Sequence, residues 1–385
     1  MNALITSEVI LTVLFLSIML GKKNKLRADN FLIVYLVFFL VREIYVYIES
    51  QGLLNESYWM LFGKSHYLLN APIFFFYVYA LTQTQDLSTK WYVIVFIPFI
   101  AYVLNFLYHY LWLFEPSAVS IHNGLVYVDG HISVPWAFFS FIFLLMEPVF
   151  IILSYILLKR YKKRVRDSFS SVDKINLNWL RVIFNIWFIA AVVLVPITTL
   201  IVGGIIGLSV DFMHLLLEIL HVAFLFILGF YGFKQTNIFS NLNLTTSDGI
   251  KESVSYERSG LGKEQAAYYH QQLLVLMKEK KPYLNGELSA GELAQRLNIS
   301  VNHLSQILNT IQRQNFFDFV NGYRIQEVIE KMKDPKNRHL TLLAIALDSG
   351  FNSKTSFNTV FRKVTHQTPS QYAKSLSREN TVKTD

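Results

Sequence analysis

Cysteine is absent from this chain of 385 residues, which excludes disulfides, thiolate metal sites and cysteine nucleophiles. Charged residues are scarce, at 16% of the chain, against about 25% in a typical soluble domain. The sequence also lacks a Walker-type phosphate loop, a GxSxG motif, an HExxH motif and a kinase-like set of residues. We therefore expect no enzymatic activity, no catalytic residue and no cofactor.

Hydrophobic residues are abundant, at 53% of the chain, and include 32 Phe and 21 Tyr. Before residue 233 they form runs close to the ~20 residues that cross a bilayer as a helix. We predict seven membrane spans, at about residues 3–20, 31–48, 67–81, 91–114, 136–158, 182–208 and 212–230. The third span is the least defined, because Asn70 and Pro72 interrupt its apolar run.

Basic residues alternate between successive loops of this region. The loops after the first, third and fifth spans carry Lys or Arg, whereas Lys64 is the only basic residue in the loops between them. Loops rich in Lys and Arg stay in the cytoplasm. The alternation predicts that the N-terminus faces outward and that the chain after the seventh span lies in the cytoplasm.

The loop between the fourth and fifth spans contains two turn signals. Asn123-Gly124 and Asp129-Gly130 lie among β-favouring residues, and Asn-Gly in that setting favours a β-hairpin. We predict a hairpin, or three short strands, within residues 120–134. An irregular loop is the alternative.

The composition divides the chain into three parts. Residues 1–233 form the predicted seven-span domain, the polar stretch 234–262 reads as a linker, and residues 263–385 show the periodicity of small soluble helices. The last part carries 17 basic and 11 acidic residues, so its charge favours contact with phosphates. The predicted fold is all-α, a transmembrane bundle followed by a soluble domain.

The soluble part contains a first helix-turn-helix pattern. Ser289 and Glu292 form a capping-box signal that opens a short helix, Asn298 suits a left-handed turn, and Ser300 can cap a second helix. Hydrogen-bonding side chains of the types that contact base edges in a major groove lie on the outer face of that second helix: Asn302, His303, Ser305, Gln306 and Asn309.

A second pattern of the same kind occupies residues 341–363. Gly350 supplies the turn, and the next helix begins near Ser353 with Phe357 and Phe361 directed inward. Its outer face carries Lys354, Thr355, Asn358, Thr359, Arg362 and Lys363. Residues 316–333 read as one long helix that connects the two patterns, and Thr368-Pro369 begins a last helix.

Residues 285–374 resemble the AraC-type (AraC/XylS) DNA-binding domain. The resemblance rests on Leu293-Ala294, Ser300, Leu304-Ser305, Asn321, Tyr323-Arg324, Ile345-Ala346, Ser349-Gly350-Phe351, Ser353, Phe357, Phe361-Arg362-Lys363, Thr368-Pro369-Ser370 and Tyr372. It implies sequence-specific binding of double-stranded DNA, usually as a dimer. The whole layout is similar to a bacterial subgroup with an N-terminal multi-span membrane region, which implies the cytoplasmic (inner) membrane. His366 departs from a common glycine and Ala373 from a common arginine.

Ionisable residues inside membrane spans are costly and therefore informative. His214, Glu218 and His221 share one face of the seventh span, and Glu147 lies in the middle of the fifth. We predict that these four residues form a sensing site for a ligand, a proton or a metal. The alternative is that they only join helices by hydrogen bonds.

The sequence thus predicts a membrane-embedded one-component transcription regulator with DNA, the lipid bilayer and an unidentified signal as partners. The rival hypothesis is a transporter or membrane enzyme fused to a regulatory domain, which repeats between halves of the membrane region would favour. A passive membrane anchor is the third hypothesis.

Overall fold

The computed structural model describes residues 2–53, 59–83, 87–112, 119–122, 125–128, 130–173, 175–202, 205, 210–246 and 261–382. The chain divides into two compact units. The first unit comprises Met1–Tyr161 and Leu177–Ser240, and the second comprises Lys162–Asn176 and Asn241–Asp385. Residues 162–176, which lie within the predicted membrane domain in the sequence, belong to the second unit together with the C-terminal helices.

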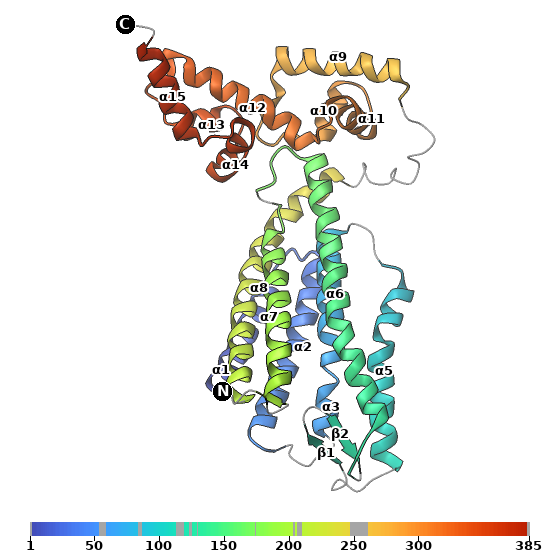
Figure 1. The fold of residues 1–385 in the computed structure, drawn as a ribbon. Helices are drawn as coiled ribbons and strands as arrows, with labels where there is room; N and C mark the ends of the chain where they lie inside the picture. The colour runs from blue at the N-terminus through green and yellow to red at the C-terminus, as the bar shows by residue number, and fades with distance from the viewer. Residues whose placement is uncertain are drawn as a thin grey trace. The chain divides into compact units, whose positions relative to one another are not determined.

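The first unit is built of helices (Figure 1). They are α1 (Asn2–Leu20), α2 (Arg27–Ser50), α3 (Trp59–Lys64), α4 (Tyr67–Thr82), α5 (Thr89–Trp112), α6 (Val134–Ser168), α7 (Asn178–Val202) and α8 (Val210–Thr246). α2 packs against both α1 and α4. The expected all-α class is confirmed, apart from one small sheet.

Five helices of this unit are long and apolar enough to cross a membrane: α1, α2, α5, α6 and α8. α4 has 16 residues, or about 24 Å at 1.5 Å per residue, which is short of a hydrocarbon core of about 30 Å. In α7 the described apolar stretch is Asn178–Ala190. The structure therefore supports five candidate spans rather than the seven predicted.

The surface of these helices is apolar as well. Ile10, Leu104, Phe138 and Phe188 are each about 60% exposed, on α1, α5, α6 and α7 respectively. Soluble monomers rarely expose contiguous apolar surface on this scale. Such a surface suits contact with lipid.

A small antiparallel sheet follows α5, with strands β1 (Val119–His122), β2 (Leu125–Val128) and β3 (His131–Ile132) in the order β1-β2-β3. The predicted hairpin is confirmed, together with its third strand. Gly130, between β2 and β3, has φ +79°, a conformation that L-residues rarely adopt. Asn123 and Gly124 lie outside the described residues. The sheet and the N-terminus lie at the same end of the first unit (Figure 1).

The second unit contains α9 (Lys263–Lys280), α10 (Ala290–Arg296), α11 (Val301–Ile307), α12 (Phe316–Lys333), α13 (Leu342–Asp348), α14 (Lys354–Thr365) and α15 (Pro369–Val382). α12 begins and ends where the sequence predicted. It contributes to two hydrophobic cores, one shared with α9, α10 and α11 and the other with α13 and α14. Residues 234–246 of the predicted linker belong to α8, and residues 247–260 lie outside the described part of the chain.

The turns of both helix-turn-helix patterns form as the sequence indicated. Ser300 Oγ accepts a hydrogen bond from His303 N at 3.1 Å, and Asn298 adopts φ +54°. Gly350 has φ +93°, and a Cβ there would lie 2.3 Å from the carbonyl oxygen of Tyr283. Only glycine fits that turn without displacing the backbone.

One local detail differs from expectation, and a second explains a departure from the family pattern. Ser289 Oγ caps α10 by accepting from Glu292 N, but the Glu292 carboxylate binds Arg296 at 2.6 Å instead of the backbone of Ser289. His366 ends α14 with φ +58°. The left-handed conformation explains why a glycine suits this position.

Candidate functional site

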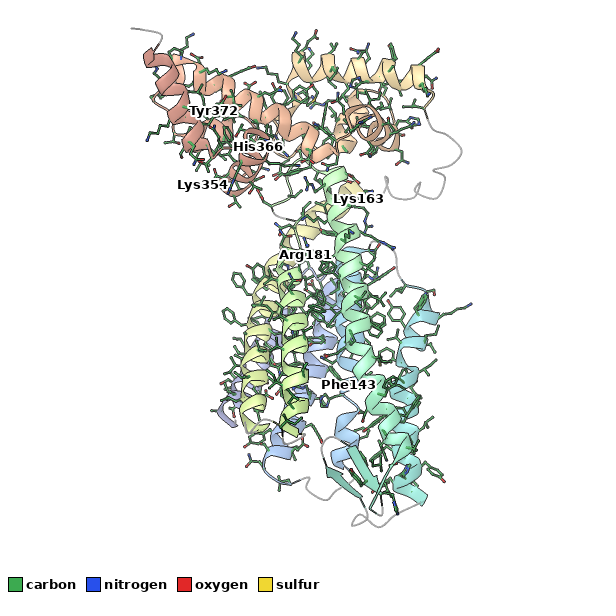
Figure 2. All side chains as sticks on the ribbon, viewed as in Figure 1. Phe143, Lys163, Arg181, Lys354, His366 and Tyr372 are labelled. Carbon is green, nitrogen blue, oxygen red and sulfur yellow. The ribbon has the colours of Figure 1, made fainter. Side chains whose placement is uncertain are left out.

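The α14 helix presents a polar outer face to solvent. Phe357 and Phe361 on its inner face are 2% and 0% exposed. The six residues predicted to contact DNA are all exposed: Lys354, Thr355, Asn358, Thr359, Arg362 and Lys363. Lys354 lies at the start of this helix (Figure 2). Lys363 Nζ donates to Asp318 Oδ1 at 2.8 Å, so one of the six residues predicted to contact DNA is paired within the domain.

The predicted DNA-contacting residues of α11 are less uniform. Asn302, His303 and Ser305 are half-buried, and exposed Asn309 lies in a π-helical turn, Leu308–Gln312, that follows the helix. The side-chain amide of Gln306 is hydrogen-bonded within the domain. Its Oε1 accepts from Leu261 N at 3.1 Å, and its Nε2 donates to Leu261 O at 3.2 Å. Sequence reasoning missed this contact because Leu261 lies 45 positions away.

Arg324 on α12 is buried in the second unit, with 1% of its surface exposed. Its Nε donates to Tyr283 O and its Nη2 to Asn285 O, both at 2.8 Å, while Nη1 donates to Asn321 Oδ1 at 3.1 Å. Burial lowers the pKa of Arg324 to about 10, so the guanidinium remains charged at neutral pH. Arg324 thereby ties α12 to the loop that precedes α10.

One turn further along α12, Glu327 forms a second buried network. Its Oε2 accepts from Lys281 Nζ at 2.8 Å and from the Tyr283 hydroxyl at 3.0 Å. Burial alone would raise the pKa of Glu327, but these hydrogen bonds outweigh it and hold the pKa below its usual value. The hydrogen bond to Glu327 in turn raises the pKa of Lys281.

The second unit is thus a domain of two helix-turn-helix units joined by one long helix. A protein of unknown function from Listeria innocua has a solved structure that matches with 26% identity over 27% of this chain and 93% of that chain, at a TM-score of 0.24. Over 90 residues the chain is 34% identical to uncharacterized HTH-type transcriptional regulators of Staphylococcus aureus strains COL and MSSA476. That stretch is 23% of this chain and 12% of each relative.

The family described as a helix-turn-helix domain matches residues 293–375. The C-terminal region of this chain therefore carries an AraC-type helix-turn-helix domain. The resemblance seen in the sequence is confirmed for this region.

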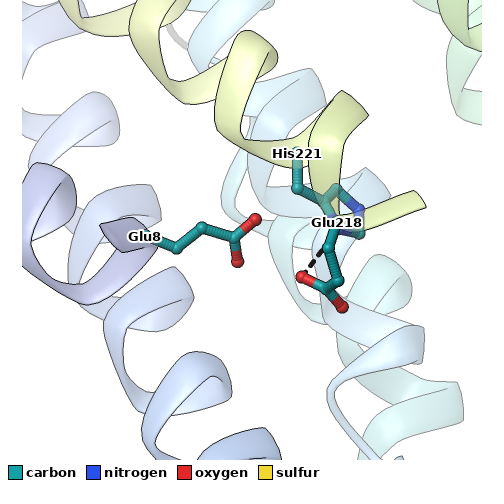
Figure 3. A group of neighbouring side chains, drawn as sticks. All are labelled: Glu8, Glu218 and His221. Atoms are coloured by element: carbon teal, nitrogen blue, oxygen red, sulfur yellow. Dashed lines mark ion pairs between the residues drawn. The ribbon is translucent and has the colours of Figure 1, made fainter. Parts of the chain in front are cut away.

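A cluster of buried and half-buried ionisable side chains lies in the first unit (Figure 3). Glu218 and His221 lie on α8, with His221 Nδ1 3.9 Å from Glu218 Oε2. Glu8 of α1 joins them, and one ligand atom from each of the three residues lies within 4.8 Å of the others. Glu8 is fully buried. Among the described residues no nitrogen donor binds either of its carboxylate oxygens, and its neighbours are the carboxyl groups of Glu43 and Glu218.

Of the four predicted sensing residues, the structure describes the side chains of Glu147, Glu218 and His221. Glu218 and His221 meet, whereas the side chain of His214 lies outside the described residues. Glu147 lines a cavity of about 40 Å³ with Tyr35, Asn70 and other residues. A cavity needs only about 10–15 Å³ of such volume to hold one water molecule, so this one has room for water.

Two members of the buried polar region escaped the sequence reasoning. Glu8 is the only charged residue between positions 3 and 20, and that isolation was an available signal. Glu43 of α2 is also fully buried and pairs with Arg42. Its position near the end of a predicted span favoured an interfacial location, but its side chain is buried.

The chemistry of the Glu8, Glu218 and His221 cluster suits a cation. Two carboxylates and an imidazole are ligands that divalent transition metals and zinc accept in proteins. A buried carboxylate without a partner is strongly destabilising unless a positive charge or a proton compensates it. The cluster is therefore a candidate cation site.

Proposed function

We propose that this chain is a membrane-embedded one-component transcription regulator. The observation that carries the proposal is the combination, in one chain, of five membrane-length apolar helices with an AraC-type DNA-binding domain. In this proposal α3 together with α4 forms one further span and α7 another, which completes a seven-span bundle with the N-terminus outside and residues 263–385 in the cytoplasm. The location of the N-terminus and the β-sheet at one end of the first unit agrees with that orientation.

Topology reporters test the membrane part. Fusions after residues 25, 165 and 240 should report cytoplasm, and a fusion near residue 125 should report the outside. A cytoplasmic signal at residue 125 would refute the seven-span arrangement.

DNA binding is tested separately by genome-wide mapping of DNA bound to the full chain and to a variant without residues 1–161. Absence of enriched sites with the full chain would refute its role as a regulator.

DNA contact through the exposed faces of α11 and α14 belongs to the same proposal. Asn302, His303, Ser305 and Asn309 are assigned to base edges or phosphates, as are the six residues of α14. Gln306 has a structural contact with Leu261, so its release would have to precede any contact with a base. Binding as a dimer at paired sites is the arrangement that the family resemblance implies.

The sensing part of the proposal rests on the Glu8, Glu218 and His221 cluster, which would take a divalent cation. Glu218→Gln keeps the shape of the side chain and removes its charge. In cells, this variant should fix expression of the mapped target genes at one level whether Mn²⁺ or Zn²⁺ is supplied or chelated. An exposed control, Glu264→Gln on α9, should respond as the wild type does. A normal metal response of Glu218→Gln would show that the cluster only joins helices.

A further inference from the structure

The segment Lys162–Asn176 lies between α6 and α7 in the sequence and belongs to the second unit. Phe169 pairs with Ser289 in an isolated antiparallel bridge. The next residue, Ser170, donates to the carbonyl oxygen of Leu288 twice, from its backbone N at 3.2 Å and from Oγ at 2.7 Å. The segment is therefore held against the start of the first helix-turn-helix unit.

Ser170 also completes the hydrogen bonding of α12. Its carbonyl oxygen accepts from Asn321 Nδ2 at 2.9 Å and from Arg324 Nη1 at 3.1 Å, and its Oγ accepts from Arg324 Nη2 at 3.0 Å. Ser170 is 1% exposed. A charged donor inside a protein is costly without acceptors, so this serine is part of what makes the burial of Arg324 tolerable.

The same segment reaches the second helix-turn-helix unit. Val172 packs against the core that α13 and α14 share, and Asp173 accepts a hydrogen bond from Ser353 Oγ at the start of α14. Arg166 donates to Asp318 at 2.8 Å and lies 4.9 Å above the ring of Phe317. One short segment thus contacts the first helix-turn-helix unit, the connecting helix α12 and the second helix-turn-helix unit.

We propose that Lys162–Asn176 is a docking segment that holds the two helix-turn-helix units in the arrangement that binds DNA, and couples that arrangement to α6. The proposal rests on the proposed function. α6 has 35 residues, or about 52 Å of helix, more than a hydrocarbon core of about 30 Å requires. Its last turn carries Arg166 and leads directly to Ser170. A shift or rotation of α6 would be passed to the segment along the chain itself, because α6 ends at Ser168 and Ser170 follows two residues later.

Charge supports a role in favour of DNA binding. Within Lys162–Asn176 five residues are basic and two are acidic, so docking adds positive charge to a domain that binds a polyanion. Two contact surfaces held in register bind one duplex more tightly than two that move independently, because the second contact is made within a single complex.

The test compares Ser170→Trp with the wild-type full-length chain in lipid nanodiscs. Indole does not fit the site of a buried serine, so the segment must leave. Gln272→Trp, on the exposed face of α9, is the matched control. The probe is a 40-bp duplex that the wild-type chain enriches from a random pool. Ser170→Trp should bind it about tenfold more weakly, amide hydrogen exchange in residues 162–176 should accelerate, and the control should match the wild type.

A second variant tests the docked state without removing it. The chain has no cysteine, so Phe169→Cys with Ser289→Cys creates one defined pair. Residues paired across an antiparallel bridge have Cα separations of about 4.5–5.5 Å, within the range for a disulfide. The oxidised variant should bind the duplex at least as tightly as its reduced form.

The outcomes separate the two proposals. If the wild-type chain enriches no duplex, the proposed function fails and the coupling fails with it. If the wild type binds and Ser170→Trp binds equally well or better, only the coupling is overturned. Weaker binding by the oxidised cysteine pair than by its reduced form would also overturn it, because docking would then oppose DNA binding.

Discussion

Replacing Arg324 with methionine removes the centre of the polar network in the DNA-binding domain while keeping a side chain of similar length. The guanidinium donates to the backbone carbonyl groups of Tyr283, Asn285 and Ser170. The carbonyl of Ser170 keeps its hydrogen bond from Asn321 and that of Asn285 keeps its hydrogen bond from Leu288 N, so the Tyr283 carbonyl loses most. A buried carbonyl left without a partner costs about 1–3 kcal/mol. Together with the lost hydrogen bonds of a charged donor, this should lower the free energy of unfolding of the domain by about 2–3 kcal/mol.

Amide hydrogen exchange of the full-length chain in detergent micelles measures this loss locally, at the amides of α12. A decrease of about 3 kcal/mol accelerates exchange roughly 100-fold, since 1.4 kcal/mol corresponds to a factor of ten. Arg324→Lys keeps the charge but not the planar fork, and should lie between methionine and wild type.

The matched control is Arg296→Met. Arg296 is 41% exposed in its ion pair with Glu292, and such surface pairs contribute less than about 1 kcal/mol. If α12 of Arg324→Met exchanged no faster than α12 of this control, the network around Arg324 would not stabilise the domain, and the reasoning would be refuted.

Three further predictions concern the same domain. Asn302→Ala should relax sequence preference by about 1–3 kcal/mol at one base pair, whereas Arg362→Ala should weaken binding to all duplexes alike and lower the salt slope by about one phosphate; equal effects in binding titrations would contradict this division. His366→Gly should raise the free energy of unfolding by up to about 1 kcal/mol, because the left-handed conformation costs an L-residue about 1–2 kcal/mol and the freedom of glycine in the unfolded chain offsets part of it; a melting temperature that falls would count against this reason. The folded-state pKa of Glu327 lies below its unfolded value, so its stabilising effect is present above pH 4.5 and is lost as pH falls through the folded pKa; Glu327→Gln should flatten that acid dependence in denaturant titrations, and an unchanged profile would argue against it.

Local patterns of the sequence determined the helices of the DNA-binding domain. A serine cap, an asparagine in a left-handed turn and a turn glycine each act within a few residues, so their consequences at Ser300, Asn298 and Gly350 could be predicted. The long helix Phe316–Lys333 followed from its periodicity. Its role as the link between two units came from spacing that the AraC-type resemblance explains. Apolar length likewise indicated α1, α2, α5, α6 and α8 as candidate spans.

Tertiary structure alone decided which distant residues meet. Ser170 and Arg324 are 154 positions apart, and nothing in the local pattern of residues 162–176 distinguishes a docking segment from an ordinary basic loop. Glu8 joined Glu218 in the same way, through packing of α1 near α8. Hydrophobic periodicity specifies which face of a helix is buried, but it does not specify the partner. Partners depend on how the buried faces fit together, and on which polar groups must find acceptors once water is excluded.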